Sequence, residues 1–247
     1  MILYGKPVAD ALREQSAEWI EVMAWKRTLT VIRDDTSDKG YLAAIKREAE
    51  RWKINLMYAY GPFRAKKMRA NRAIDIRNPA NIIMTAFCSV DGQNDRGRET
   101  VYAGRMSNET PCTAEAIIRM LDYYNIPIAG KHAVVIGRSE RVGKPTAMLL
   151  LARDATVTVC HSHTPKMELN AAISRAGIIV CASGQKRLLD YWTQVKCLDS
   201  RQAVIINVGG DYEEKSAWAE TMNVNLCPFR GGVGPVTTAV LMSHVLM

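Results

Sequence analysis

Residues 131–164 read KHAVVIGRSERVGKPTAMLLLARDATVTVCHSHT, and this stretch decides the fold. Two short apolar runs within it, 132–136 and 156–160, are rich in β-branched residues, which is typical of strands buried on both faces of a sheet. Pro145 suits the first turn of a helix, because the N–H that it lacks would be unpaired there. The stretch therefore predicts a buried strand, a tight loop, a helix that continues over 146–152, and a second buried strand.

The loop of this stretch runs from Gly137 to Gly143, between a strand and the N-terminus of a helix. Backbone N–H groups and the positive end of the helix dipole face such a loop, so it can hold a phosphate group. Its pattern differs from GxGxxG, since Ser139 stands where the second glycine would be. Taken alone, the loop is therefore also compatible with an ordinary connection between a strand and a helix.

Strands and helices alternate along most of the chain. Further strands are expected at residues 28–32, 81–88, 177–181 and 203–208, and further helices at 8–25, 41–52, 111–121, 167–175 and 231–246. This alternation indicates βαβ units, a parallel sheet and the α/β class. Ligands of such sheets bind beyond the carboxyl ends of the strands. The loops expected to share that edge are 137–143, 161–164, 182–185 and 208–211.

The end of the second strand bears on the choice of cofactor. NAD-selective sites usually place an Asp or Glu about 20 residues beyond the glycines, where it binds the ribose 2′-hydroxyl. Here the segment Cys160–Thr164 contains no carboxylate. Arg138, Ser139 and Arg141 in the facing loop supply cations and a hydroxyl, which suit a 2′-phosphate, so NADP is preferred to NAD. Solvated surface charge is the alternative reading of the two arginines.

Composition limits the classes of partner. The 247 residues allow one large or two modest domains, and the net charge of +8 favours an anionic ligand. The basic residues are not interleaved with aromatic ones as in single-strand binders, so no nucleic-acid partner is predicted. No apolar run approaches the roughly 18 residues of a membrane span. Charged residues also come too early at the N-terminus for a secretory signal, so no membrane association is expected.

The cysteines are scattered and contain no CxxC pair. They lie at positions 88, 112, 160, 181, 197 and 227. Several fall within expected strands, so free, mostly buried thiols in a reducing cytoplasm are the expected state. No metal site is predicted.

Four motifs follow one another along the chain. They are PCT (111–113), GRSERVGKP (137–145), TVTVCHSHT (156–164) and GGVGPVTTAVLM (231–242). Together they resemble the bifunctional methylenetetrahydrofolate dehydrogenase/methenyltetrahydrofolate cyclohydrolases, from about residue 100 to the C-terminus. The resemblance implies a Rossmann-type parallel-sheet NAD(P) domain and a smaller α/β substrate domain, which the C-terminal helix completes. On this pattern we expect the substrate domain at 1–115 with the helix 234–247, and the NAD(P) domain at 116–233.

The resemblance also implies a reaction. A hydride passes from 5,10-methylenetetrahydrofolate to NADP and leaves 5,10-methenyltetrahydrofolate. In the second activity of the family, water attacks this cation and the ring opens to 10-formyltetrahydrofolate. The family is usually dimeric, so a homodimer through the NAD(P) domain is expected.

Site residues follow from the matching motifs. Lys46, in the helix AAIKREAERW, resembles the family's catalytic lysine, which would hydrogen-bond near N10 and manage protons. Substrate contacts are implied for Tyr41, Asp91, Gly231, Gly232, Gly234 and Pro235. Cofactor contacts are expected from Gly137, Arg138, Ser139, Val142, Gly143, Pro145, His161, Ser162, Thr164, Ser183, Gly184 and Gly209. The ordinary readings are a surface lysine for Lys46, and turn residues for Asp91 and for 231–235.

The chain departs from the family pattern at several positions. The family's tyrosine four residues before the lysine is Leu42 here, its supporting glutamine is Thr85, and its first aspartate is Ser89. The proline-containing loop and the helix that follow the glutamine strand are missing. These departures concern the substrate side and the hydrolytic step, and they leave the cofactor motifs intact.

Two other functions remain open at this level. One is an NADP-dependent dehydrogenase of another small substrate, with the same cofactor domain and a rebuilt first domain. The other is a non-catalytic regulator that binds NADP or folate.

Overall fold

The computed structural model describes residues 1–24, 27–33, 39–60, 72–75, 101–107, 110–185, 203–210 and 224–246. The chain forms two compact units. The large-sheet unit comprises Met1–Val8 and Thr113–Val236, and the small-sheet unit comprises Ala9–Cys112 and Thr237–Met247. No helix among the described residues is long and apolar enough to cross a membrane.

The large-sheet unit is built on five parallel strands. They are β4 (His132–Ile136), β5 (Thr156–Cys160), β6 (Ile178–Cys181), β7 (Val204–Asn207) and β8 (Asn225–Cys227). Their order in the sheet is β5-β4-β6-β7-β8. The chain thus moves outward from β4 to β5 and then returns to the other side of β4. Such a reversal of strand order is where open α/β sheets place their ligands.

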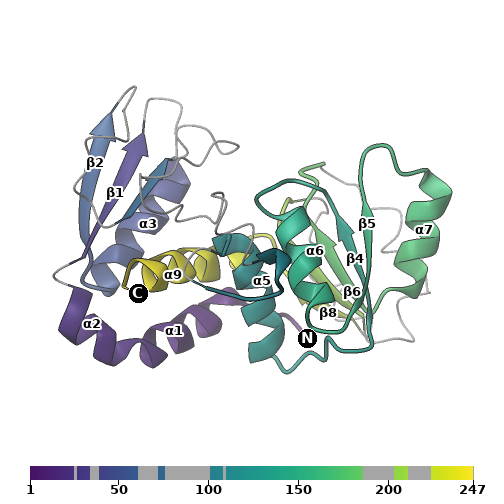
Figure 1. Cartoon of the computed structure of the whole chain (residues 1–247), viewed down its shortest axis with the longest axis horizontal. Coiled ribbons are helices and arrows are strands. Elements are labelled where there is room, and N and C mark those ends of the chain that lie inside the picture. The colour runs from purple at the N-terminus through teal and green to yellow at the C-terminus, as the bar shows by residue number, and fades with distance from the viewer. Residues whose placement is uncertain are drawn as a thin grey trace. The chain divides into compact units, whose positions relative to one another are not determined.

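Two helices of the described residues connect strands of this sheet and cover it. α6 (Gly143–Leu151) connects β4 to β5, and α7 (Lys166–Arg175) connects β5 to β6. The two crossovers run in opposite directions along the sheet. Because parallel crossovers are right-handed, the two helices must lie on opposite faces, as Figure 1 shows. The strands β4, β6 and β7 between them are almost wholly buried, which explains their continuous apolar sequences.

β5 corrects one expectation from the sequence. It was expected to be buried on both faces, but Thr156 and Val159 are exposed. The reason is its place at the edge of the sheet, where it pairs only with β4. Its β-branched residues are typical of any pleated strand, so composition alone does not separate an edge strand from a central one.

β8 has only three residues and was not predicted. The N-terminal segment supports it from the other side: the N–H of Leu3 donates to the Leu226 carbonyl at 2.7 Å, and the N–H of Leu226 donates to the Met1 carbonyl at 2.9 Å. This pairing joins residues more than 220 positions apart. A local sequence pattern cannot reveal it.

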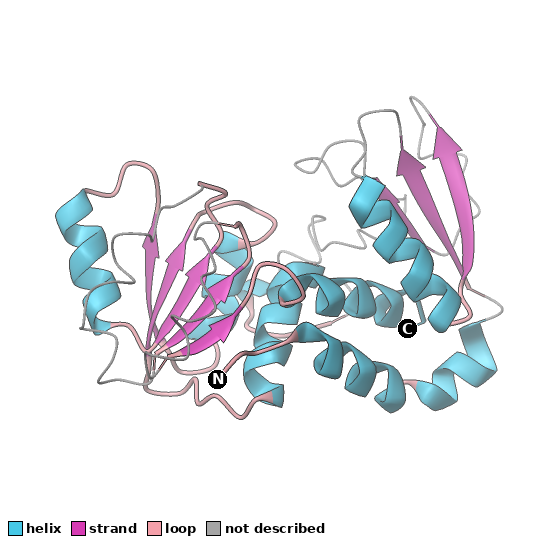
Figure 2. Ribbon diagram, turned by 180° about the vertical axis from the view of Figure 1, so that it is seen from behind, coloured by secondary structure: helices cyan, strands magenta, loops and turns pink. Residues whose placement is uncertain are grey.

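The small-sheet unit contains a second parallel sheet. Its strands are β1 (Thr28–Arg33), β2 (Asn55–Tyr60) and β3 (Arg72–Asp75), in the order β2-β1-β3. α3 (Lys39–Arg51) connects β1 to β2 and lies beside this sheet in Figure 2. The buried side chains Ile45, Ala49 and Trp52 pack beneath this connection, and the Trp52 indole donates to Glu48 at 2.9 Å. β2 and β3 were not predicted, and the strand expected at 81–88 lies outside the described residues.

The first helical segment divides in two, although one helix was expected over 8–25. α1 (Gly5–Gln15) and α2 (Ala17–Met23) meet at Ser16, whose hydroxyl donates to the Leu12 carbonyl at 2.9 Å. Serine side chains that bond back to the i−4 carbonyl commonly bend helices. The remaining helices are α5 (Cys112–Tyr123) and α9 (Val233–Leu246).

Candidate functional site

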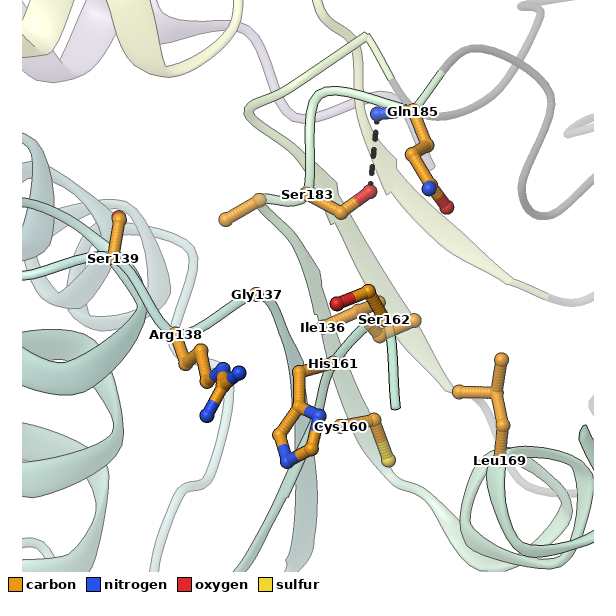
Figure 3. Close-up of a pocket in the computed structure, with 11 residues that line it drawn as sticks. Ile136, Gly137, Arg138, Ser139, Cys160, His161, Ser162, Leu169, Ser183 and Gln185 are labelled. Atoms are coloured by element: carbon orange, nitrogen blue, oxygen red, sulfur yellow. Dashed lines mark hydrogen bonds between the residues drawn. The ribbon is translucent and has the colours of Figure 1, made fainter. Parts of the chain in front are cut away.

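A cavity of about 220 Å³ opens at the carboxyl ends of β4, β5 and β6. Figure 3 shows it lined by the last residue of β4, the last residue of β5 and the three loops that follow these strands. The lining residues are Ile136, Gly137, Arg138, Ser139, Cys160, His161, Ser162, Leu169, Ala182, Ser183 and Gln185. Three of the four loops expected to share one edge of the sheet thus meet around this space.

Glycine at 137 and 143 lets the loop sit close to the sheet. Gly137 has φ +126°, and a Cβ there would lie 2.4 Å from the Ala182 carbonyl oxygen. A Cβ at Gly143 would lie 2.2 Å from the Gly137 carbonyl oxygen. Both distances are far below van der Waals contact, so no other residue fits without a backbone shift. The two glycines bring the first turn of α6 against the end of β4, the arrangement that presents a helix N-terminus to a phosphate.

Ser139 organises the start of α6. Its Oγ accepts the N–H of Val142 at 3.2 Å and the N–H of Gly143 at 3.4 Å, and its carbonyl accepts the N–H of Lys144 at 3.0 Å. The first two bonds are long, and they involve helix N-terminal donors that have no partner within the helix. A serine in place of the second glycine therefore caps the helix and still lines the cavity.

The loop after β5 is a turn that begins at His161 and ends at Thr164. The His161 N–H donates to Thr164 Oγ1 at 2.9 Å, and its carbonyl accepts the Thr164 N–H at 2.8 Å. His161 Nδ1 accepts the N–H of His163 at 3.2 Å. An imidazole nitrogen that accepts a hydrogen bond carries no proton, so the proton of the neutral ring lies on Nε2. The turn therefore fixes His161 as a donor through Nε2.

Polar groups in the cavity are donors rather than carboxylates. Among the described residues, the guanidinium of Arg138 and the hydroxyl of Ser162 have no hydrogen-bond or ion-pair partner, whereas Arg141 has an interaction of its own. None of the described residues that line the cavity is Asp or Glu. Arg138 is thus the better placed of the two arginines to meet an anion.

Cys160 forms part of the apolar wall. Its side chain is buried, and burial raises the pKa of the Cys160 thiol. The group is consequently a neutral thiol at physiological pH and behaves as a small apolar side chain. None of the four described cysteines forms a disulfide and all four are buried, which confirms this part of the expectation from the sequence.

Six of the residues expected to contact cofactor line the cavity, and six do not. Those that line it are Gly137, Arg138, Ser139, His161, Ser162 and Ser183. Those that do not are Val142, Gly143, Pro145, Thr164, Gly184 and Gly209. The predicted contacts did not include five of the lining residues, Ile136, Cys160, Leu169, Ala182 and Gln185. The loop 182–185 was expected at this edge, although Gln185 was not assigned a contact, whereas Leu169 belongs to α7, which no motif placed here.

The residues expected on the substrate side lie on other segments. Lys46 and Tyr41 are on α3, where Lys46 is exposed and Tyr41 is half-buried. Asp91 lies outside the described residues.

Gly231, Gly232, Gly234 and Pro235 span the start of α9. Gly231 has φ +78°, and a Cβ at Gly232 would lie 1.9 Å from the Pro228 carbonyl oxygen. Gly231 and Gly232 therefore have a structural reason to be glycine, while a Cβ at Gly234 would meet nothing within 4 Å.

Comparison with known proteins agrees with this geometry. Residues 111–247 match the family model described as tetrahydrofolate dehydrogenase/cyclohydrolase, NAD(P)-binding domain. The bifunctional protein FolD of Nocardia farcinica is 34% identical to the chain over 281 aligned positions, which cover 99% of this chain and 95% of that protein. These positions exceed the 247 residues of the chain by 34, so the relative has segments without a counterpart here.

Solved structures share the fold. The bifunctional enzyme FolD of Campylobacter jejuni superposes with a TM-score of 0.80 at 23% identity, covering 100% of this chain and 97% of that one. The methylenetetrahydrofolate dehydrogenase-cyclohydrolase of Trypanosoma brucei, solved with NADP and an inhibitor, has a TM-score of 0.80 at 22% identity, covering 100% and 96%. With a family model over more than half its length and a 34% identical relative aligned over nearly all of it, the chain belongs to the tetrahydrofolate dehydrogenase/cyclohydrolase family.

Proposed function

We propose that this protein oxidises 5,10-methylenetetrahydrofolate to 5,10-methenyltetrahydrofolate with NADP as hydride acceptor. One observation carries the proposal: a cavity at the reversal of strand order is lined by the Arg138 guanidinium, and the described residues around it include no carboxylate. Its position is that of the dinucleotide in open α/β sheets. Membership in the family supplies the class of substrate.

The donors at the end of β5 favour the phosphorylated cofactor. Arg138, His161 Nε2 and Ser162 Oγ are potential donors around the position where a ribose 2′-substituent lies in such sites. Charge-assisted bonds from guanidinium to phosphate are short and strong. A carboxylate at this place would accept the 2′-hydroxyl of NAD and repel the phosphate, and no carboxylate of the described segments lines the cavity. The bound cofactor supplies the hydride acceptor, and the protein's task is to position the two rings.

The folate contacts proposed here are those that the family resemblance implies. Tyr41 offers an aromatic ring, Asp91 a carboxylate for the pterin N–H groups, and the turn at 231–235 the N-terminus of α9. Lys46 is the candidate for proton handling when water opens the methenyl ring. Its exposed ammonium on α3 is accessible to a substrate.

We also propose that the protein is a cytoplasmic homodimer. β5 is an edge strand with an exposed Val159, so its free backbone groups are available for pairing with a second copy. The free, buried cysteines suit a reducing compartment.

A single assay tests the proposed reaction. Purified protein is mixed with 5,10-methylenetetrahydrofolate and either NADP or NAD, and the absorbances of reduced cofactor and methenyl product are followed. We expect reduction with NADP and much less with NAD. If neither NADP nor NAD is reduced, the proposal is refuted. Binding of NADP without turnover of this folate would favour a dehydrogenase of another substrate or a regulator.

A further inference from the structure

The cavity is lined by more residues than the binding of a phosphate-bearing ribose requires. Apart from the loops already assigned, its wall consists of Ile136, Cys160, Leu169, Ala182 and the side chain of Gln185. Four of these present apolar surface, and one presents a carboxamide. Phosphate and sugar gain nothing from an apolar wall, so this part of the cavity suits a flat, weakly hydrated ring.

Its size agrees with a partial enclosure of the cofactor. At about 220 Å³ the cavity is below the roughly 300–1,000 Å³ of pockets that enclose a whole drug-sized ligand. It therefore encloses one portion of a dinucleotide. The described lining loops follow β4, β5 and β6, and residues 208–210 after β7 do not line the cavity, so this portion lies toward the β5 edge.

The covalent structure of a nucleotide identifies that portion. The ribose 2′-position lies at the end of β5, near His161 and Ser162. The base is attached to C1′, the carbon bonded to C2′, so it must lie within a few ångströms of the same turn. The space next to that turn is bounded by Leu169 of α7 and by Gln185.

Gln185 combines a backbone held in a turn with a side chain that can bind a ligand. Its N–H donates to Ser183 Oγ at 3.1 Å, which fixes the turn after β6, and the positive φ of Gly184 (+71°) completes that turn. The backbone is thus held, while the carboxamide has no hydrogen-bond partner among the described residues. In Figure 3 the carboxamide extends from the turn toward the side of the cavity where Leu169 lies.

We propose that Gln185 recognises the adenine base of the cofactor, with Leu169 and Cys160 forming the apolar surface against its ring. A carboxamide places one acceptor and one donor side by side. Adenine matches them with the 6-amino group as donor and an adjacent ring nitrogen as acceptor, and this pairing is a common means of reading adenine. The proposal rests on the proposed NADP site and adds a residue that sets selectivity for the base.

The test uses adenosine 2′,5′-bisphosphate, which contains the base and the 2′-phosphate but no nicotinamide. Its dissociation constant is measured by titration calorimetry with the wild-type protein, Gln185→Ala and Gln15→Ala. Gln15 is an exposed glutamine at the end of α1 and serves as the matched control. A hydrogen bond is worth about 1 kcal/mol, so Gln185→Ala should weaken binding about fivefold, and Gln15→Ala should not change it.

A double-mutant cycle locates the contact. The same titrations are made with the purine analogue of the bisphosphate, which lacks the 6-amino group. If Gln185 contacts that group, the wild type binds the analogue about fivefold more weakly than the adenine compound. The substitution Gln185→Ala then lowers the affinity for the analogue much less than it lowers the affinity for the adenine compound. If Gln185→Ala lowers the affinity for both compounds equally, or does not lower the affinity for the adenine compound, the assignment of Gln185 is overturned while the proposed NADP site stands. Absence of binding of NADP and of the bisphosphate to the wild type would overturn the NADP site itself.

Discussion

The two arginines of the phosphate loop differ in what they touch, although they are three residues apart in the sequence. Arg138 lines the cavity without a partner among the described residues, while Arg141 does not line it and has an interaction of its own. Ser139 of the same loop uses its hydroxyl oxygen to accept two backbone N–H groups at the start of α6. Single side chains of one loop thus divide between holding the fold and meeting a ligand.

Arg138→Ala is expected to raise the dissociation constant for NADP by roughly 10- to 100-fold, because charge-assisted hydrogen bonds are worth about 1.5–3 kcal/mol. The constant for NAD should change little, since NAD lacks the 2′-phosphate. Arg141→Ala is the matched control and should have a much smaller effect. Calorimetric titration with both cofactors measures this, and an equal loss for NADP and NAD in Arg138→Ala would contradict the assignment.

Cys160 should react slowly with iodoacetamide at pH 7. Burial raises the pKa of this thiol, so less of it is thiolate at a given pH than for an ordinary cysteine, and only the thiolate reacts. The rate should increase as pH is raised toward 9. Peptide mapping by mass spectrometry follows the site, with the guanidinium-unfolded protein as control. Equal rates at pH 7 in the folded and unfolded protein would refute the expectation.

Lys46→Ala should slow hydrolysis of the methenyl product by at least about 100-fold, which is the lower end of the range for loss of a general acid–base group. The first residue of the same helix, Lys39, is also exposed, and Lys39→Ala is the control. Methenyl absorbance reports the rate, while NADP binding should be unchanged in both variants. Unaltered hydrolysis in Lys46→Ala would remove this residue from the catalytic proposal.

Elements of the large-sheet unit depend on close backbone contacts. α6 begins where the Gly143 Cα approaches the Gly137 carbonyl, and β4 ends where Gly137 approaches Ala182. The positions of α6, β4 and the loop between them therefore depend on one another. A change at one glycine alters the packing of α6 on the sheet and the shape of the cavity.

Gly143→Ala should lower the free energy of unfolding by about 1–3 kcal/mol, the usual cost of forcing atoms into a packed site, since its Cβ would lie 2.2 Å from a carbonyl oxygen. It should also weaken NADP binding. Gly234→Ala is the control, because its Cβ would meet nothing within 4 Å and alanine favours a helix by up to about 1 kcal/mol. Thermal and urea unfolding compare the two, and equal stabilities would contradict the packing argument.

At the scale of the whole molecule, the family relation is clearest in the cofactor half. The matching family model begins at residue 111, and a full-length relative needs 34 more aligned positions than this chain has residues. The chain therefore retains the dinucleotide fold in a shorter form of the enzyme. Ligand binding to the large-sheet unit should be visible in the stability of the folded protein.

NADP at 100 times its dissociation constant should stabilise the protein by about 2.7 kcal/mol through mass action. NAD at the same concentration should give a smaller shift in the unfolding temperature. Differential scanning calorimetry measures both, and Arg138→Ala is the control in which the difference between the cofactors should largely disappear. An identical shift with NADP and NAD in the wild type would contradict the predicted preference.

The sequence by itself determined the elements whose signals are local. β4 was predicted at its observed bounds, and the alternation of elements indicated a parallel sheet with ligands at its carboxyl edge. The glycines, the proline and the missing carboxylate indicated a phosphate-binding loop suited to NADP. These features depend on neighbours within a few residues, where periodicity, backbone freedom and charge decide the conformation.

Only the tertiary structure decided the features that depend on distant pairings. β5 is an exposed edge because no strand of the described residues lies beyond it, and β8 pairs with β7 with support from the N-terminal segment. Leu169 and Gln185 line the same cavity because α7 connects β5 to β6 across β4, which brings this helix and the loop after β6 to one edge of the sheet. Such contacts bring together residues separated by tens or hundreds of positions, and no local pattern encodes which of them will meet.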